Sequence, residues 1–310
     1  SRQISSAVLR TLRSARSFTM KRLKPYVQWL VLTLCLGFVA RAAIAHWQAV
    51  SSLNLDSEDG WLLLAAWLVT ALAHCWAGWV WGWIVRDLGQ PVVGMQAMRI
   101  YLRTNLAKYV PGNVWHFYGR VTALKAMGSS LGAATLSTAL EPLLMAAAAL
   151  LVAIAGLRWA AGWATGLGFI SIAIGIHPRW LNRVARLMER SPAPPVPARL
   201  QRYPLGPLLG EVGFVLLRSA GFLAIVMALH PVPATDFLTI ASGFSLAWVL
   251  GLIVPGAPGG LGVFEASAIA LLQDQLGVGV LVQIVAMYRL IGTLAEIAGA
   301  GWAVLPVRRS

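Results

Sequence analysis

Runs of about twenty apolar residues, separated by short basic segments, recur along almost the whole chain. A helix needs roughly 20 apolar residues to cross a hydrocarbon layer of about 30 Å. Six runs reach that length, and we expect each to span the membrane: 27–50, 60–85, 131–157, 159–176, 207–230 and 277–305. The sequence therefore predicts an all-α, polytopic membrane protein that lies in a lipid bilayer.

The composition excludes a water-soluble protein of this size. Only 12% of the 310 residues are charged, while 58% are hydrophobic. Soluble domains carry about 25% charged residues, because their outer surface faces water. This chain lacks the residues for such a surface.

The positive charge alternates with the apolar runs. The formal net charge is +14, and 21 of the 25 Lys and Arg residues fall in 1–26, 85–131, 177–206 and the last four residues. The other four are Arg41, Arg158, Arg218 and Arg289. This spacing is typical of cytoplasmic loops that orient helices, and it argues against a nucleic-acid partner. We expect both termini to be cytoplasmic, the acidic loop 56–59 to be external, and the protein to lie in the plasma (inner) membrane.

One integral membrane domain, 27–305, accounts for most of the chain. A basic N-terminal arm, 1–26, precedes it, and a short cytoplasmic tail, 306–310, follows it. The domain divides into halves 27–157 and 159–305. Within it, the basic and proline-rich connection 177–206 has the pattern of a short interfacial helix.

Two segments, 94–127 and 236–272, do not fit simple spans. Each contains Val-Pro-Gly, at 110–112 and at 254–256. Proline removes a helical donor and glycine loosens the backbone, so both segments should be broken. A pair of Gly/Pro-interrupted segments at corresponding positions in two halves points to the binding site of a transporter.

Two topologies agree with these interruptions. If both segments are re-entrant helical hairpins, the chain has six full spans and an inverted repeat, and the two interruptions approach each other within the membrane. If the arms cross separately, the chain has eight spans. The arm 261–272 is only twelve residues long, which favours the hairpins.

The interrupted segments also carry a resemblance. The stretches NLAKYVPGNVWHFYGR (105–120), VPGAPGGLGVFEASAIALL (254–272) and YRLI (288–291) resemble the transmembrane region of lysylphosphatidylglycerol synthetases, a family with stand-alone members that lack the synthetase domain. The resemblance covers about 27–305. At Phe264 this sequence departs from the family, which commonly has arginine there.

The resemblance implies a flippase or scramblase that moves a phospholipid or a lipid-linked anionic molecule between leaflets. We expect no soluble domain after the last span, and therefore transport and no enzymatic activity. The chain has no phosphate-binding G-x-x-x-x-G-K-[ST] loop, so ATP is not expected to drive it. We expect no cofactor and no metal; a second copy of the chain or a separate lipid-synthesising enzyme are the candidate protein partners.

The candidate substrate-binding residues combine basic groups, the broken turns and membrane-depth charges. Arginine and lysine suit a headgroup phosphate, and unwound helix ends offer backbone N–H groups. Ionisable residues at membrane depth usually face a polar cavity. The set is Arg103, Lys108, Pro111, Gly112, His116, Arg120, Pro255, Gly256, Gly259, Gly260, Glu265, Arg289 and Glu296.

Simpler interpretations compete with this assignment. The basic residues of the first segment could form an interfacial face that meets anionic lipids, and the ion pairs could only lock helices together. Glu141, which precedes Pro142, could be an acid at a helix start. Two other functions also stay open. One is a glycosyltransferase-like intramembrane enzyme that uses acids of the loop 56–59, and the other is a lipid-binding subunit that transports nothing.

Overall fold

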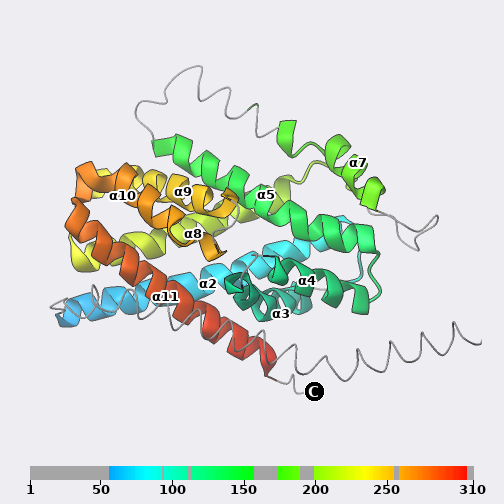
Figure 1. Ribbon diagram of the computed structural model, residues 1–310, viewed down its shortest axis with the longest axis horizontal. Helices are drawn as coiled ribbons and strands as arrows, with labels where there is room; N and C mark the ends of the chain where they lie inside the picture. The colour runs from blue at the N-terminus through cyan, green and yellow to red at the C-terminus, as the bar shows by residue number, and fades with distance from the viewer. Residues whose placement is uncertain are drawn as a thin grey trace, which may run out of the picture.

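A bundle of long helices makes up the computed structural model of the protein (Figure 1). The structure describes residues 56–92, 94–110, 114–156, 170, 174–188, 199–254 and 258–305. Within these ranges it contains nine α-helices and no strand, which confirms the all-α class for this part of the chain. The elements are α2 (Ser57–Asp87), α3 (Gly94–Asn105), η1 (Leu106–Tyr109), α4 (Trp115–Ala126), α5 (Leu131–Gly156), α7 (Pro178–Met188), α8 (Leu205–Leu229), η2 (Ala234–Asp236), α9 (Phe237–Ile253), η3 (Pro258–Gly260), α10 (Val263–Leu276) and α11 (Val278–Val304).

Five of the described helical segments are long and apolar enough to cross a membrane. Helices α2, α5, α8 and α11 coincide with four of the six expected spans. The fifth is α9 together with η2, which belongs to the second interrupted segment. The expected span 27–50, most of 159–176, the N-terminal arm and the C-terminal tail lie outside the described residues.

The outer surface of these helices is apolar. Leu64, Leu68 and Leu72 follow one another every four residues on α2, and their side chains are 43–55% exposed. Leu209 and Leu216 are similarly exposed on α8. Residues at this spacing share one face of a helix, and water-soluble monomers rarely expose such continuous apolar surface. A lipid bilayer is the environment that covers it favourably.

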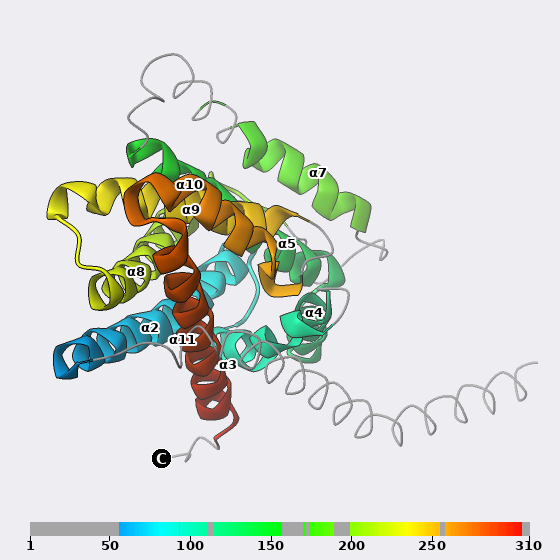
Figure 2. The same cartoon turned by 60° about the vertical axis from the view of Figure 1, so that its left-hand side comes forward.

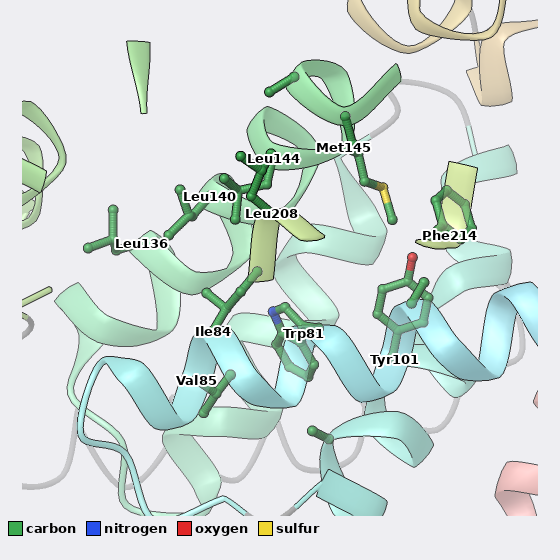
Figure 3. Packing of buried hydrophobic residues seen from close by; sticks show 14 of the residues in the cluster. Trp81, Ile84, Val85, Tyr101, Leu136, Leu140, Leu144, Met145, Leu208 and Phe214 are labelled. Atoms are coloured by element: carbon green, nitrogen blue, oxygen red, sulfur yellow. The ribbon is translucent and has the colours of Figure 1, made fainter. Parts of the chain in front are cut away.

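The main core lies where α2 packs along α8 and both meet α5. Figure 3 shows the side chains that fill this junction. Trp76 Nε1 donates a hydrogen bond of 2.7 Å to the carbonyl of Gly210, and a Cβ at Gly210 would lie 2.7 Å from Val80 Cγ2. Only glycine permits this approach, because a methyl group would overlap the α2 side chains.

Both interrupted segments end a helix at the valine that precedes proline. Val110 (φ −72°, ψ 137°) ends η1, and Val254 (φ −72°, ψ 115°) ends α9. Proline disfavours the helical conformation of the residue before it, so the sequence itself dictates both ends. Farther along the second segment, Gly259 and Gly260 have φ angles of +61° and +71°, which favour glycine.

The short helices next to the two interruptions meet inside the bundle. The short helices η1 and η3 are in contact, and a Cβ at Gly259 would lie 2.9 Å from Cε1 of Tyr109. This contact agrees with the expectation that the interruptions approach each other. Helices α3 and α4 have 12 residues each, about 18 Å, and are too short to cross about 30 Å of hydrocarbon alone.

Where a short interfacial helix was expected, the structure contains the helix α7, at the edge of the bundle beside α5 (Figures 1 and 2). Trp180 and Arg183 are exposed, whereas Leu181 is buried. Asn182 Nδ2 donates to the carbonyl of Leu200, and its Oδ1 accepts from the backbone N–H of the same residue. These two bonds tie α7 to the segment that leads into α8.

Candidate functional site

A cavity of about 350 Å³ lies where the two interruptions meet. Its walls come from α2, α3, η1, α4, α5, α8, α9, η3, α10 and α11, so residues far apart in sequence share it. The volume is in the range of small-molecule sites. The charged and imidazole side chains that line it are His74, Lys108, His116, Arg120, Glu141, Arg218, Arg289 and Glu296.

An ion pair on one wall joins η1 to α11. Lys108 Nζ lies 2.5 Å from Glu296 Oε1, although the residues are 188 positions apart. His74 Nε2, on α2, lies 3.4 Å from the same oxygen. The carboxylate is 4% exposed, so the ammonium group of Lys108, rather than water, compensates its charge. The other oxygen, Oε2, has no hydrogen-bond partner among the described residues.

A second ion pair joins α4 to α5. Arg120 Nη1 lies 2.6 Å from Glu141 Oε2, and both side chains are almost fully buried. The guanidinium also lies 3.9 Å from the centre of the Tyr101 ring, a cation–π distance. Glu141 is therefore not an acid at a helix start: α5 begins at Leu131, and Glu141 is one of its inner, paired residues.

A third pair fixes the glycine turn. Arg289 Nε lies 2.6 Å from Glu265 Oε1, while Arg289 Nη1 and Nη2 donate to the carbonyl oxygens of Gly259 and Gly260 at 2.9 Å. Glu265 Oε2 also accepts from the backbone N–H of Gly262. Arg289 thus lines the cavity. Glu265 contacts Arg289 but is not among the described residues that line the cavity.

Arg218 is the cavity-lining cation that these pairs leave uncompensated. It lies on α8, is 7% exposed, and donates from Nη2 to the Tyr288 hydroxyl. Its Nε and Nη1 have no hydrogen-bond partner among the described residues, and no carboxylate there lies within 4 Å. The guanidinium lies 4.7 Å from the centre of the Tyr288 ring. The cavity therefore offers one desolvated positive charge.

Most of the candidate residues within the described ranges surround this cavity. Arg103 does not: it is exposed on α3 and is not part of the lining. His116 does, and its Nδ1 has no described hydrogen-bond partner. The candidates that the structure brings to the cavity are Lys108, His116, Arg120, Gly259, Gly260, Arg289 and Glu296. The candidates that lie outside the described residues are Pro111, Gly112, Pro255 and Gly256.

Three buried ionisable groups had no role predicted from the sequence. Arg218 was noted only as a basic residue outside the basic segments, and His74 and Glu211 were not singled out. For Arg218 and Glu211 the signal was present, because each interrupts an apolar span and ionisable residues at membrane depth are costly. His74 carried no comparable signal, because a lone histidine in a span is common in helix cores.

Comparison of the sequence with known protein families and with curated proteins gives no match. The functional interpretation therefore depends on the geometry of the cavity.

Proposed function

We propose that this protein moves a lipid with an anionic headgroup between the two leaflets of a membrane, as a flippase or scramblase. The observation that carries the proposal is the uncompensated Arg218 in the cavity. Lys108, Arg120 and Arg289 are each neutralised by a carboxylate at 2.5–2.6 Å. The positive charge of Arg218 is therefore available to bind one negative charge of a ligand. A phosphodiester headgroup carries that charge.

The donors around Arg218 suit a phosphate. Its Nε and Nη1 have no hydrogen-bond partner among the described residues, and the N–H groups of a guanidinium donate strong, charge-assisted hydrogen bonds to phosphate oxygens. His116, with an unpartnered Nδ1, borders the same cavity. A volume of about 350 Å³ suits a headgroup, and the acyl chains would stay among the lipids outside.

The interrupted segments fit this function as re-entrant hairpins of an inverted repeat. The short helices α3 and α4 of the first segment, and the contact of Tyr109 with Gly259 of the second, support a binding site at membrane depth between the two segments. In this proposal the substrate is a phospholipid or a lipid-linked anion. Both termini are cytoplasmic in the plasma (inner) membrane, and the chain works as a transporter, alone or beside a lipid-synthesising enzyme.

The geometry gives less support to the glycosyltransferase-like alternative. That reading needs the acids of the loop 56–59 at a reaction centre. Asp59 Oδ2 instead accepts a hydrogen bond of 2.9 Å from the backbone N–H of Asp56, which caps the start of α2. The acids therefore have a structural use in the helix start.

Reconstitution tests the proposal. Protein in phosphatidylcholine vesicles should move NBD-labelled phosphatidylglycerol between leaflets, measured by dithionite quenching. Arg218→Gln should slow this movement roughly tenfold or more per folded molecule, since charge-assisted hydrogen bonds contribute about 1.5–3 kcal/mol. Arg218→Lys should move the lipid at an intermediate rate, because lysine keeps the positive charge but lacks the planar set of N–H donors of the guanidinium. The matched control is Arg103→Gln, an exposed arginine outside the cavity. Equal rates for wild type and Arg218→Gln would reject the proposal.

A further inference from the structure

Glu211 differs from the other fully buried carboxylates in the described part of the chain, because it has no basic partner. It lies on α8 with no exposed surface, and neither carboxylate oxygen has a hydrogen-bond partner there. Glu141 and Glu296 are buried as well, yet each accepts from an arginine or lysine at 2.6 and 2.5 Å. An ionised carboxylate without donors is costly to bury, so such a group takes up a proton.

Glu211 and Arg218 lie on the same face of α8. They are seven positions apart, which is two helical turns or about 10 Å. Arg218 is near the middle of the helix, whereas Glu211 is about 9 Å from its first residue, Leu205. That end of α8 follows the basic connection 177–206, which the charge pattern places on the cytoplasmic side.

The charges in and beside the cavity balance when Glu211 is included. Among the described residues the cations are Lys108, Arg120, Arg218 and Arg289, and the carboxylates are Glu141, Glu211, Glu265 and Glu296. With Glu211 ionised the set is neutral, and with Glu211 protonated it has one positive charge. An anion at Arg218 then restores neutrality. The proton and the anion therefore favour each other's binding.

We propose that Glu211 is a proton-binding site coupled to the anion at Arg218, so that one proton accompanies each lipid headgroup. The inference rests on the proposed function and adds the ion, a proton, to which lipid movement is coupled. The proton moves from water to one carboxylate oxygen of Glu211, and no other bond changes. A unit charge about 10 Å away in a protein interior changes an affinity about tenfold, and the effect is reciprocal.

The groups that act on Glu211 come from neighbouring helices. Glu141 of α5 and Arg120 of α4 interact with it electrostatically, as does Tyr101 of α3. Glu141 also lines the cavity, so it links Glu211 to the headgroup site. Among the described elements, α2, α5, α9 and α11 pack against α8, and α9 carries no ionisable side chain between Phe237 and Ile253. The other ionisable side chains of these helices are Glu58, Asp59, His74, Cys75, Arg86 and Asp87 of α2, and Tyr288, Arg289 and Glu296 of α11.

Infrared titration tests the proton site without transport. The wild-type protein in detergent should show the carbonyl stretch of a protonated carboxylic acid, which Glu211→Gln should lack and the exposed control Glu58→Gln should keep. Adding phosphatidylglycerol should raise the proton affinity of this group about tenfold, which moves its titration by about one pH unit. Absence of the band from wild type, its persistence in Glu211→Gln, or no effect of phosphatidylglycerol would each overturn the inference. If Glu211→Gln does not fold, the wild-type titration with and without the lipid still decides.

Transport at varied pH tests the coupling. In phosphatidylcholine vesicles, wild type should move NBD-labelled phosphatidylglycerol about tenfold faster at the acidic end of the infrared titration than at the basic end. Glu211→Gln, which stays neutral, should move it at one rate throughout. The same pH dependence in both proteins would overturn the coupling. No lipid movement by wild type at any pH would reject the proposed function instead, while the infrared measurement would still decide the proton site.

Discussion

Arg289 lies 2.6 Å from Glu265 and also donates to the carbonyl oxygens of Gly259 and Gly260, so one guanidinium joins α11 to the start of α10 and to the turn before it. Glu265 uses its second oxygen to accept from the backbone N–H of Gly262. Both side chains therefore have structural partners for most of their hydrogen-bonding capacity. This geometry favours the interpretation that the pair holds the turn in place. The pair then lies beside the anion-binding site and does not form it.

The first prediction follows from this pair. Glu265→Gln and Arg289→Gln should each destabilise the protein by about 2 kcal/mol, because each removes charge-assisted hydrogen bonds from a partly buried site. The double variant should lose less than the sum of the two. Thermal unfolding in detergent measures this, and lipid movement per folded molecule should change little for Glu265→Gln. Normal stability with lost transport would instead place Glu265 in the transport mechanism.

Gly259→Ala should also destabilise the protein. The φ angle of +61° is unfavourable for alanine, and the new Cβ would lie 2.9 Å from the ring of Tyr109. Strain of this kind costs of order 1–3 kcal/mol. Gly301→Ala is the control, because a Cβ there meets no atom within 4 Å and the residue is helical. Thermal unfolding of the two variants compares them, and equal midpoints would contradict the strain argument.

Much of the fold could be predicted because long runs of apolar residues identify membrane helices in a sequence. The long apolar runs predicted α2, α5, α8 and α11, and the valine–proline steps at 110 and 254 predicted the two helix ends. Local chemistry alone determines these features, since proline restricts the residue before it and a span needs a fixed number of apolar residues. The approach of the two interruptions was also expected, from their matching positions in the chain.

The partners within the site could not be predicted in the same way. Arg289 and Glu296 lie on one face of α11, yet Arg289 pairs with Glu265 and Glu296 pairs with Lys108. Glu141 looked like a helix-start acid because proline follows it, but α5 continues through that proline. Pairing between helices depends on their rotation and depth, which sequence spacing does not specify. Buried charges such as Arg218 are visible in a sequence only as exceptions within an apolar run.

Labelling from the two sides of the membrane tests the topology. In a background without Cys35 and Cys75, cysteines introduced at Ser57 and Ser310 should react with an impermeant maleimide from opposite sides, Ser57 from outside and Ser310 from inside. The expectation rests on the acidic loop 56–59 and on the basic segments that the positive-inside rule places in the cytoplasm. Labelling of both positions from one side would reject the arrangement.

The Lys108–Glu296 pair gives a prediction that separates a charge requirement from a packing requirement. Lys108→Met keeps most of the side-chain volume but removes the cation that pairs with the buried carboxylate of Glu296. Removing one member of a buried pair costs about 3–5 kcal/mol, because the remaining charge stays desolvated. Lys108→Met should therefore unfold at a clearly lower temperature in detergent, whereas Lys125→Met, an exposed lysine of α4, should not.

The double variant then identifies the cause. Glu296→Gln removes the remaining charge, so Lys108→Met combined with Glu296→Gln should recover part of the stability lost in Lys108→Met alone. If the lysine instead acts through packing of η1 against α11, the second substitution restores nothing and the losses add. Recovery of stability without recovery of lipid movement would show that this ion pair, besides holding η1 against α11, is needed for the headgroup to pass the cavity.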